Sequence, residues 1–200
     1  MADAAAITTV RERMLSYQAQ TVAGDYPDAA VVVALSNEPA PGVLLTQRSP
    51  HLSLHAGEIA FPGGKQDESD ESLLHTAVRE MEEEVGISTA QFEALGALHQ
   101  RITRTKIRVT PFIGILPADV TLRINHDELD SAFYVPVDQL CSGDLFSVVN
   151  VLDNGVTKRV ARFQFGDYDI WGVTAMILAD AMNTLLGARL PIDTQPLENA

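Results

Sequence analysis

The sequence is poor in cysteine, in positive charge and in long apolar runs, and each shortage excludes a class of protein. Cys141 is the only cysteine, so the chain cannot form an internal disulfide and is not a disulfide-stabilised secreted scaffold. Lysine and arginine number 14 against 27 acidic residues, which gives a formal net charge of −13. Because phosphate backbones and anionic lipids bind clustered cations, this balance argues against nucleic acid and against a membrane surface as partners.

Targeting signals and membrane spans are also missing from the sequence. Asp3 stands where a signal peptide carries a basic residue, and no apolar segment follows it. The most apolar short run, residues 29–35, has the length of a strand and is far too short to cross a bilayer. The hydrophobic fraction of 46% is nevertheless typical of a globular protein. We therefore expect a single domain over residues 1–200, located in the cytoplasm.

Apolar periodicity and turn residues predict the order of the elements. Asp70 is the expected N-cap of a central helix and Gly86 its expected end. The segment 37–42 is a predicted turn that joins two strands into a hairpin, and the polar tail 191–200 is expected to be loose. Strands and helices that do not alternate regularly predict an α/β fold with a mixed sheet between helices. The predicted helices are 5–20, 70–85 and 171–186, and the predicted strands are 29–35, 43–46, 92–99, 108–116, 133–135 and 160–165.

Three carboxylates lie close together in the central helix. Glu80, Glu83 and Glu84 occupy positions i, i+3 and i+4, beside the apolar stripe, so they share one face. Such neighbouring negative charges raise one another's pKa values, and a bound divalent cation removes that penalty. Oxygen ligands favour a hard cation such as Mg²⁺ or Mn²⁺. Arg79 precedes these residues on the side of Glu83, where its guanidinium can orient a carboxylate.

A glycine pair, Gly63 and Gly64, closes the segment Phe61–Gly64 ahead of this helix. Glycine lets the backbone approach a ligand or a metal closely, and a loop carbonyl can complete a metal shell. A glutamate-rich helix is more often only a solvated face, but here the acids are grouped at one edge around an arginine. The combination predicts metal ions that bridge a diphosphate, polarise its phosphorus and activate water.

The sequence from Gly64 to Ile87, with the run Arg79-Glu80-Met81-Glu82-Glu83-Glu84-Val85-Gly86-Ile87, resembles the Nudix box of Nudix hydrolases. The resemblance implies an α/β/α sandwich around a mixed sheet. It also implies that the carboxylates matching Glu80, Glu83 and Glu84 bind the metal ions, with the Gly63 carbonyl as a candidate ligand. The first half of the box is one residue longer here than in the family pattern. The box glutamate therefore falls on either Asp70 or Glu71.

A longer match resembles the coenzyme A pyrophosphatases within the Nudix family. The matching segments are Leu44–Ser49, Gly57, Phe61–Gly64 and Trp171–Ala175. The resemblance implies a small-molecule substrate, coenzyme A or acyl-coenzyme A, cleaved at its diphosphate to (acyl-)4′-phosphopantetheine and adenosine 3′,5′-bisphosphate with Mg²⁺ or Mn²⁺. Ser53 stands where the subgroup usually has an arginine, and serine cannot grip a phosphate bidentately. ADP-ribose or a dinucleotide is therefore the alternative substrate, and a nucleotide sensor without turnover is the alternative function.

Three further residues complete the candidate site. Arg48, at a strand end, and Arg104, in a basic cluster, are candidates for binding substrate phosphates, although each also fits a surface charge. Glu128 is a candidate general base or extra ligand, with a turn residue as the alternative. We expect catalytic roles for Arg79, Glu83 and Glu128. The sequence is also compatible with a homodimer. The basic cluster consists of Arg101, Arg104, Lys106 and Arg108.

The acid excess is unevenly distributed along the chain. The segment Lys65–Glu84 holds eight of the 27 acidic residues and only two basic ones, so it carries nearly half of the net charge. Divalent cations bound there would partly cancel this charge. An acidic chain can therefore act on an anionic substrate, because the metal ions supply the positive charge that the chain lacks.

Overall fold

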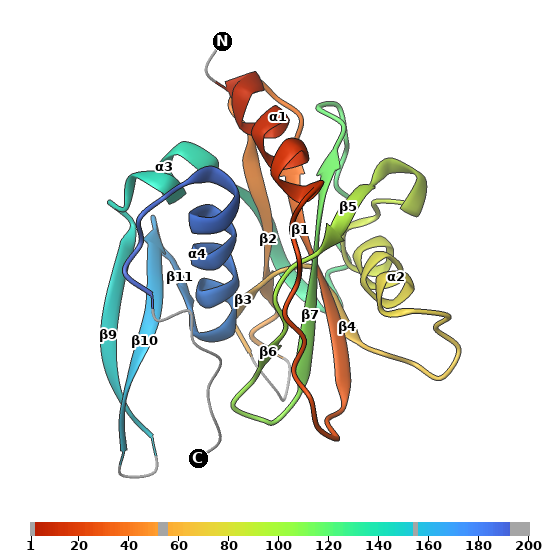
Figure 1. Cartoon of the computed structure of the whole chain (residues 1–200). Helices are drawn as coiled ribbons and strands as arrows, with labels where there is room; N and C mark the ends of the chain where they lie inside the picture. Colours follow the sequence, from red (N-terminus) through yellow and green to blue (C-terminus); the bar gives the residue numbers. More distant parts are fainter. Residues whose placement is uncertain (1–2, 52–55, 154–155, 193–200) are drawn as a thin grey trace.

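The computed structural model of the chain describes residues 3–51, 56–153 and 156–192 (Figure 1). Ser53 and the tail residues 193–200 lie outside this described part. Among the described residues, no helix combines the length and the apolar character needed to cross a membrane. The elements are α1 (Asp3–Met14), β1 (Asp28–Ser36), β2 (Gly42–Arg48), β3 (Ile59–Ala60), β4 (Gly63–Lys65), α2 (Leu73–Val85), η1 (Thr89–Gln91), β5 (Glu93–Ala97), β6 (Arg101–Ile102), β7 (Arg108–Leu116), β8 (Leu129–Pro136), α3 (Val137–Ser142), β9 (Phe146–Asp153), β10 (Val156–Phe165), β11 (Tyr168–Trp171) and α4 (Gly172–Leu186).

β1 lies inside a mixed sheet, which has eight strands among the described residues. β1 and β7 pair in parallel along their whole length, whereas β1 pairs antiparallel with both β2 and β4. β8 and β3 pair with β2, and β5 and β6 pair with β7. The pair Leu35↔Val43 confirms the hairpin predicted from residues 29–35 and 43–46.

Helices cover both faces of this sheet because β1 is apolar on both sides. Ala30, Val32 and Ala34 pack in one buried cluster with the apolar stripe of α2. Val33 and Leu35 pack in a second cluster, together with buried residues of α1 and α4 on the opposite face (Figure 1). The predicted α/β fold, a mixed sheet between helices, is therefore confirmed.

The sequence predicts only one strand, 160–165, in a region where the structure has a second sheet. β9, β10 and β11 form an antiparallel sheet whose inner face packs against α4. Phe163 on β10 and Phe146 on β9 meet edge to face, with ring centroids 5.1 Å apart. β9, β11 and the short α3 are missing from the sequence-based prediction, because these segments mix polar residues into short apolar runs.

α1 ends at Met14, whereas the apolar spacing predicts a helix to residue 20. The backbone N–H of Gln20 donates to His99 Nδ1 at 2.8 Å. The carbonyl of Gln20 in turn accepts from the N–H of Gln100 at 3.0 Å. These long-range bonds hold the segment after α1 against residues 99–100, between β5 and β6, so its backbone groups are satisfied outside a helix.

α2 begins two residues later than its predicted N-cap indicates. The cap is Ser72, whose hydroxyl accepts a hydrogen bond from the backbone N–H of His75 at 3.1 Å. The prediction that Asp70 caps the helix is therefore wrong, because the Asp70 carboxylate is buried and engaged elsewhere. Gly86, with φ of 70°, ends the helix as predicted.

Candidate active site

Arg79 is the centre of an ion-pair network on α2. Its Nε and Nη2 each donate to Asp70 at 3.0 Å, and its Nη1 lies 3.0 Å from both Glu80 and Glu83. One guanidinium therefore orients two of the three candidate metal carboxylates. The side chain of Glu83 is 56% exposed, so it reaches solvent while it remains paired with Arg79.

Asp70 holds this arginine in place from the loop ahead of the helix. Its carboxylate also accepts from the Thr76 hydroxyl at 2.9 Å and from the backbone N–H of Asp67 at 3.0 Å. The hydrogen bonds from Arg79, followed by the one from the Asp67 backbone, hold the pKa of Asp70 well below its usual range. Glu71 is exposed and its backbone N–H donates to His75. Asp70 and Glu71 are the two candidates for the position of the box glutamate, and Asp70 is the one that pairs with Arg79.

The glycine pair brings β4 into direct contact with α2. A Cβ atom on Gly64 would lie 2.4 to 2.6 Å from the carboxylate atoms of Glu80, so a larger residue does not fit beside that side chain. Gly63 has φ of 147°, and its backbone N–H donates to Glu84 Oε2 at 3.1 Å. Gly64 therefore lets the Glu80 carboxylate lie against β4, and glycine is required at position 63 both by the backbone conformation and by the closeness of the β1 backbone.

Glu84 is the most deeply buried of the three carboxylates, with 3% of its surface exposed. Burial raises the pKa of Glu84 to about 8, and the charges of Glu80 and Glu128 act in the same direction. The opposing influences are the hydrogen bond from Gly63 and the guanidinium of Arg48, whose Nη1 lies 3.9 Å from Glu84 Oε1. Burial also raises the pKa of Glu80. Negative charge is thus poorly compensated at this position.

Glu128 and Arg48 approach the same carboxylates from two other elements. The backbone N–H of Ser49 donates to the carbonyl of Glu128 at 2.8 Å, which joins the end of β2 to the loop before β8. The negative charge of Glu128 contributes to the raised pKa of both Glu80 and Glu84. The Nε of Arg48 is buried and, among the described residues, is one of the few such atoms without a hydrogen-bond partner. The fold therefore gathers Arg48 and Glu128 with the carboxylates of α2.

The donor set fits a divalent cation in chemistry, although the side chains do not form a closed cage. Within the described ranges, no group of three histidine, cysteine, aspartate or glutamate side chains is arranged to enclose a metal ion. Glu80 and Glu83 point to Arg79, and Glu84 accepts from Gly63. However, two buried or half-buried carboxylates with raised pKa values are what a hard cation stabilises.

The basic cluster predicted from the sequence is divided in the structure. Arg101 is buried and its Nη2 pairs with Asp180 of α4 at 2.7 Å, on the sheet face opposite α2. Arg108 pairs with Asp28 through two bonds of 2.7 and 2.8 Å. Arg104 lies in the turn between β6 and β7, and β7 and β1 separate this region from β4. The structure does not bring these residues together with the carboxylates, and the substrate-binding role of Arg104 stays a prediction.

Comparison with known proteins agrees with this geometry. The family model described as NUDIX domain matches residues 25–153. The chain belongs to the Nudix family. A relative named "Uncharacterized Nudix hydrolase NudL" from Shigella boydii serotype 4 is 38% identical over 156 residues, which cover 78% of this chain and 81% of the relative. The relative of the same name from Escherichia coli O157:H7 has the same identity and coverage.

This Nudix hydrolase also shares its fold with solved structures. A MutT/nudix family protein from Enterococcus faecalis superposes with a TM-score of 0.55 over 85% of this chain and 66% of that protein, at 16% identity. Nudix hydrolases act on small-molecule substrates and generally use divalent metal ions. The Nudix box of this chain comprises β4, the loop that carries Asp70, and α2.

Proposed function

We propose that this Nudix hydrolase cleaves the diphosphate linkage of coenzyme A or acyl-coenzyme A. The products are 4′-phosphopantetheine, or its acyl form, and adenosine 3′,5′-bisphosphate. The observation that carries the proposal is the buried Glu84 carboxylate, whose charge is disfavoured by Glu80 and Glu128 and which, among the described residues, forms an ion pair with one arginine, Arg48. Such a position is costly in a protein unless a cation occupies it.

Three of the four segments that resemble coenzyme A pyrophosphatases meet around β3, which supports the choice of substrate. Leu44–Ser49 includes most of β2, and β2 pairs with β3. Phe61–Gly64 follows β3 directly and leads into β4. Trp171–Ala175 joins β11 to α4, and β11 contacts β3. Segments more than 100 residues apart in sequence therefore lie next to β3 in the fold.

In this proposal Mg²⁺ or Mn²⁺ is held by Glu80, Glu83 and Glu84, with the Gly63 carbonyl as a further ligand. The bound metal supplies the positive charge that polarises the diphosphate and lowers the pKa of water. Arg79, fixed by Asp70, orients Glu80 and Glu83. Arg48 Nη1 binds a phosphate oxygen of the substrate, and the exposed carboxylate of Glu128 accepts the proton of the attacking water.

Product analysis tests the proposed reaction. Purified protein is incubated with Mn²⁺ and, separately, with coenzyme A, ADP-ribose and diadenosine tetraphosphate, and the products are separated by chromatography. We expect coenzyme A to yield equal amounts of 4′-phosphopantetheine and adenosine 3′,5′-bisphosphate. Ser53, which lies outside the described residues, keeps ADP-ribose or a dinucleotide as the alternative. Turnover of ADP-ribose without any turnover of coenzyme A would establish that alternative.

The close approach of β4 to α2 gives a further prediction. Gly64→Ala places a methyl group where the Glu80 carboxylate lies, so this ligand must move by about 1 Å, and such a displacement costs about 100-fold in rate. The measurement is the metal-dependent kcat at a fixed Mn²⁺ concentration. Gly166→Ala is the control: a Cβ atom there meets nothing within 4 Å, and although its φ of 56° strains an alanine, position 166 lies in the turn between β10 and β11, away from Glu80. Equal rates for Gly64→Ala and the control would show that Glu80 is not held against β4 during the reaction.

A further inference from the structure

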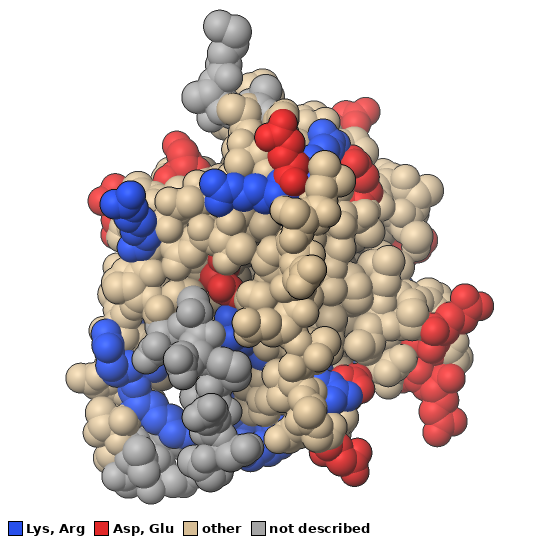
Figure 2. Space-filling model, in the orientation of Figure 1, with Lys and Arg blue, Asp and Glu red and all other residues tan. Residues whose placement is uncertain are grey.

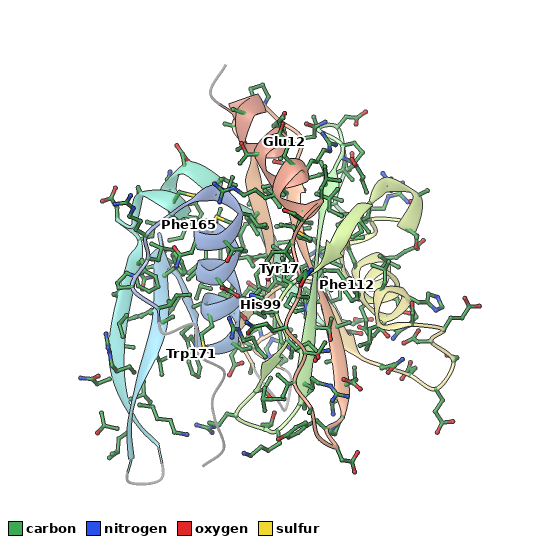
Figure 3. All side chains as sticks on the ribbon, viewed as in Figure 1. Glu12, Tyr17, His99, Phe112, Phe165 and Trp171 are labelled. Atoms are coloured by element: carbon green, nitrogen blue, oxygen red, sulfur yellow. The ribbon has the colours of Figure 1, made fainter. Side chains whose placement is uncertain are left out.

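The only tryptophan of the chain, Trp171, is exposed over 44% of its surface. A large apolar ring that stays accessible to solvent is an informative exception among buried core residues. Figure 3 shows Trp171 at the junction of β11 and α4. The next residue, Gly172, has φ of 65°, and a Cβ atom there would meet nothing within 4 Å, so the space beside the indole is open.

Arg162 lies directly opposite Trp171 on the neighbouring strand β10. Residues opposite one another in an antiparallel pair project from the same face of the sheet, with Cβ atoms about 5 Å apart. The guanidinium of Arg162 is fixed by Asp169, which accepts from its Nε at 2.6 Å and from its Nη2 at 3.1 Å. Two flat groups, an indole and an oriented guanidinium, thus lie side by side on one exposed face.

This face is supported by rigid packing and carries local positive charge. Tyr168, at the start of β11, stacks on Phe133 of β8 with ring centroids 3.7 Å apart and an interplanar angle of 8°. On β10, Lys158 and Arg162 lie on the face of Trp171, where Arg162 is paired with Asp169, whereas Arg159 lies on the opposite face. Figure 2 shows basic side chains gathered over the β9–β10 hairpin, whereas acidic side chains protrude over the loop that leads into α2. An anionic ligand is therefore attracted to the hairpin side of the molecule.

The face is connected to the carboxylates through a short piece of chain. β11 contacts β3, and the chain runs from Ala60 at the end of β3 through Pro62 to Gly63, which donates to Glu84. Three residues of extended chain span at most about 11 Å. A ligand whose phosphates lie at Glu84 can thus extend along β3 towards Trp171.

We propose that Trp171, together with Arg162, is the stacking platform for the adenine base of the substrate. Bases stack on aromatic rings and on guanidinium planes, and every adenine nucleotide offers such a flat surface. The inference rests on the proposed function in one respect, that the substrate is an adenine nucleotide. Coenzyme A and ADP-ribose share this chemistry, so the platform does not depend on which of them is hydrolysed.

Intrinsic fluorescence tests the platform directly, because the emission of the protein's tryptophan comes from Trp171 alone. The protein is titrated without divalent metal, so that no turnover occurs, with adenosine 3′,5′-bisphosphate, ADP-ribose and 4′-phosphopantetheine. We expect saturable quenching by the two ligands that carry adenine and none by 4′-phosphopantetheine, which lacks a base. Absence of quenching by both adenine ligands at millimolar concentration, or equal quenching by all three, would overturn the proposal.

Kinetics provide the second readout, for whichever nucleotide the enzyme hydrolyses. Trp171→Ala should raise KM roughly tenfold with little change in kcat, since stacking contributes to binding of the base. Trp171→Phe should restore most of the affinity. Leu15→Ala is the control, because Leu15 is 90% exposed just beyond α1 and should retain the wild-type KM. A KM unchanged in Trp171→Ala would contradict the platform, while failure of coenzyme A to react would contradict only the proposed substrate.

Discussion

Glu84→Gln is expected to abolish metal-dependent hydrolysis and, at the same time, to stabilise the metal-free protein. Glutamine preserves the shape of the side chain and an acceptor for the Gly63 N–H, but it carries no charge. The substitution therefore removes both a proposed metal ligand and the cost of burying a carboxylate beside Glu80. A gain in stability with a loss of activity is the signature of a residue retained for function.

The stabilisation should depend on pH in a defined direction. The pKa of Glu84 is about 8 in the folded protein against an ordinary value of 4.5. Between these values the unfolded chain ionises while the folded protein keeps the proton, so the free energy of unfolding falls as pH rises from 4.5 to about 8. Glu84→Gln lacks this decrease and should be more stable by a few kcal/mol at pH 8, since one pKa unit corresponds to about 1.4 kcal/mol.

Urea denaturation of the metal-free proteins at pH 5 and pH 8 measures the difference. The control is Glu82→Gln, the same chemical change at an exposed residue of the same helix, α2. The variant Glu84→Gln should gain stability over wild type at pH 8 but not at pH 5, and the control should follow wild type at both. In addition, Mn²⁺ should raise the melting temperature of wild type much more than that of Glu84→Gln. A stability difference that is the same at both pH values would contradict the burial cost assigned to Glu84.

Glu83→Gln is expected to lower the metal-dependent kcat on the order of 1,000-fold, equivalent to about 4 kcal/mol of transition-state stabilisation. Glu83 faces solvent over 56% of its side chain and is held 3.0 Å from Arg79. An exposed ion pair of this kind contributes little to folding, so the variant should unfold at nearly the same urea concentration as wild type. The measurement is the rate of diphosphate cleavage at saturating substrate across a range of Mn²⁺ concentrations.

Glu82→Gln again provides the matched comparison, because the two glutamates are adjacent but Glu82 lies outside the Arg79 network. We expect Glu82→Gln to retain the wild-type rate and metal dependence. If Glu83→Gln also retains full activity, Glu83 is not a ligand and the proposed metal site is wrong. If both variants lose activity equally, the effect reflects the charge of the helix rather than a ligand at position 83.

The central helix is largely predictable from sequence because its signals are local. The spacing of Glu80, Glu83 and Glu84, the apolar stripe and the glycine at position 86 all act within one helix, and the structure has these residues on α2. The strands 29–35 and 108–116 are likewise found, since both are apolar on two sides and pair in parallel at the centre of the sheet.

Long-range partners explain where the sequence-based prediction fails. Asp70 looks like a helix cap, yet it binds Arg79, nine residues away, and Ser72 takes the cap. The basic cluster reads as one patch, yet the partners of Arg101 and Arg108 are Asp180 and Asp28, which lie 79 and 80 residues away in sequence. Nothing within a short window of sequence indicates such pairs, because folding alone brings them together.

Nearly half of the net charge lies in Lys65–Glu84, and the structure divides these acids into three settings. Asp70 is neutralised by Arg79, and Glu71 and Glu82 are exposed to solvent. Glu80 and Glu84 have raised pKa values and lie against β4. Only this last setting is a cost to the metal-free protein, so the unfavourable burial of negative charge comes from two carboxylates rather than from the whole segment.

The relative kcat/KM for coenzyme A and ADP-ribose, measured in one competition assay with Mn²⁺, tests the central claim most directly. We expect coenzyme A to be consumed first, with stoichiometric release of adenosine 3′,5′-bisphosphate, and chelation of the metal to stop the reaction. Consumption of ADP-ribose with coenzyme A left intact, or hydrolysis of either substrate that continues without divalent metal, would contradict that claim.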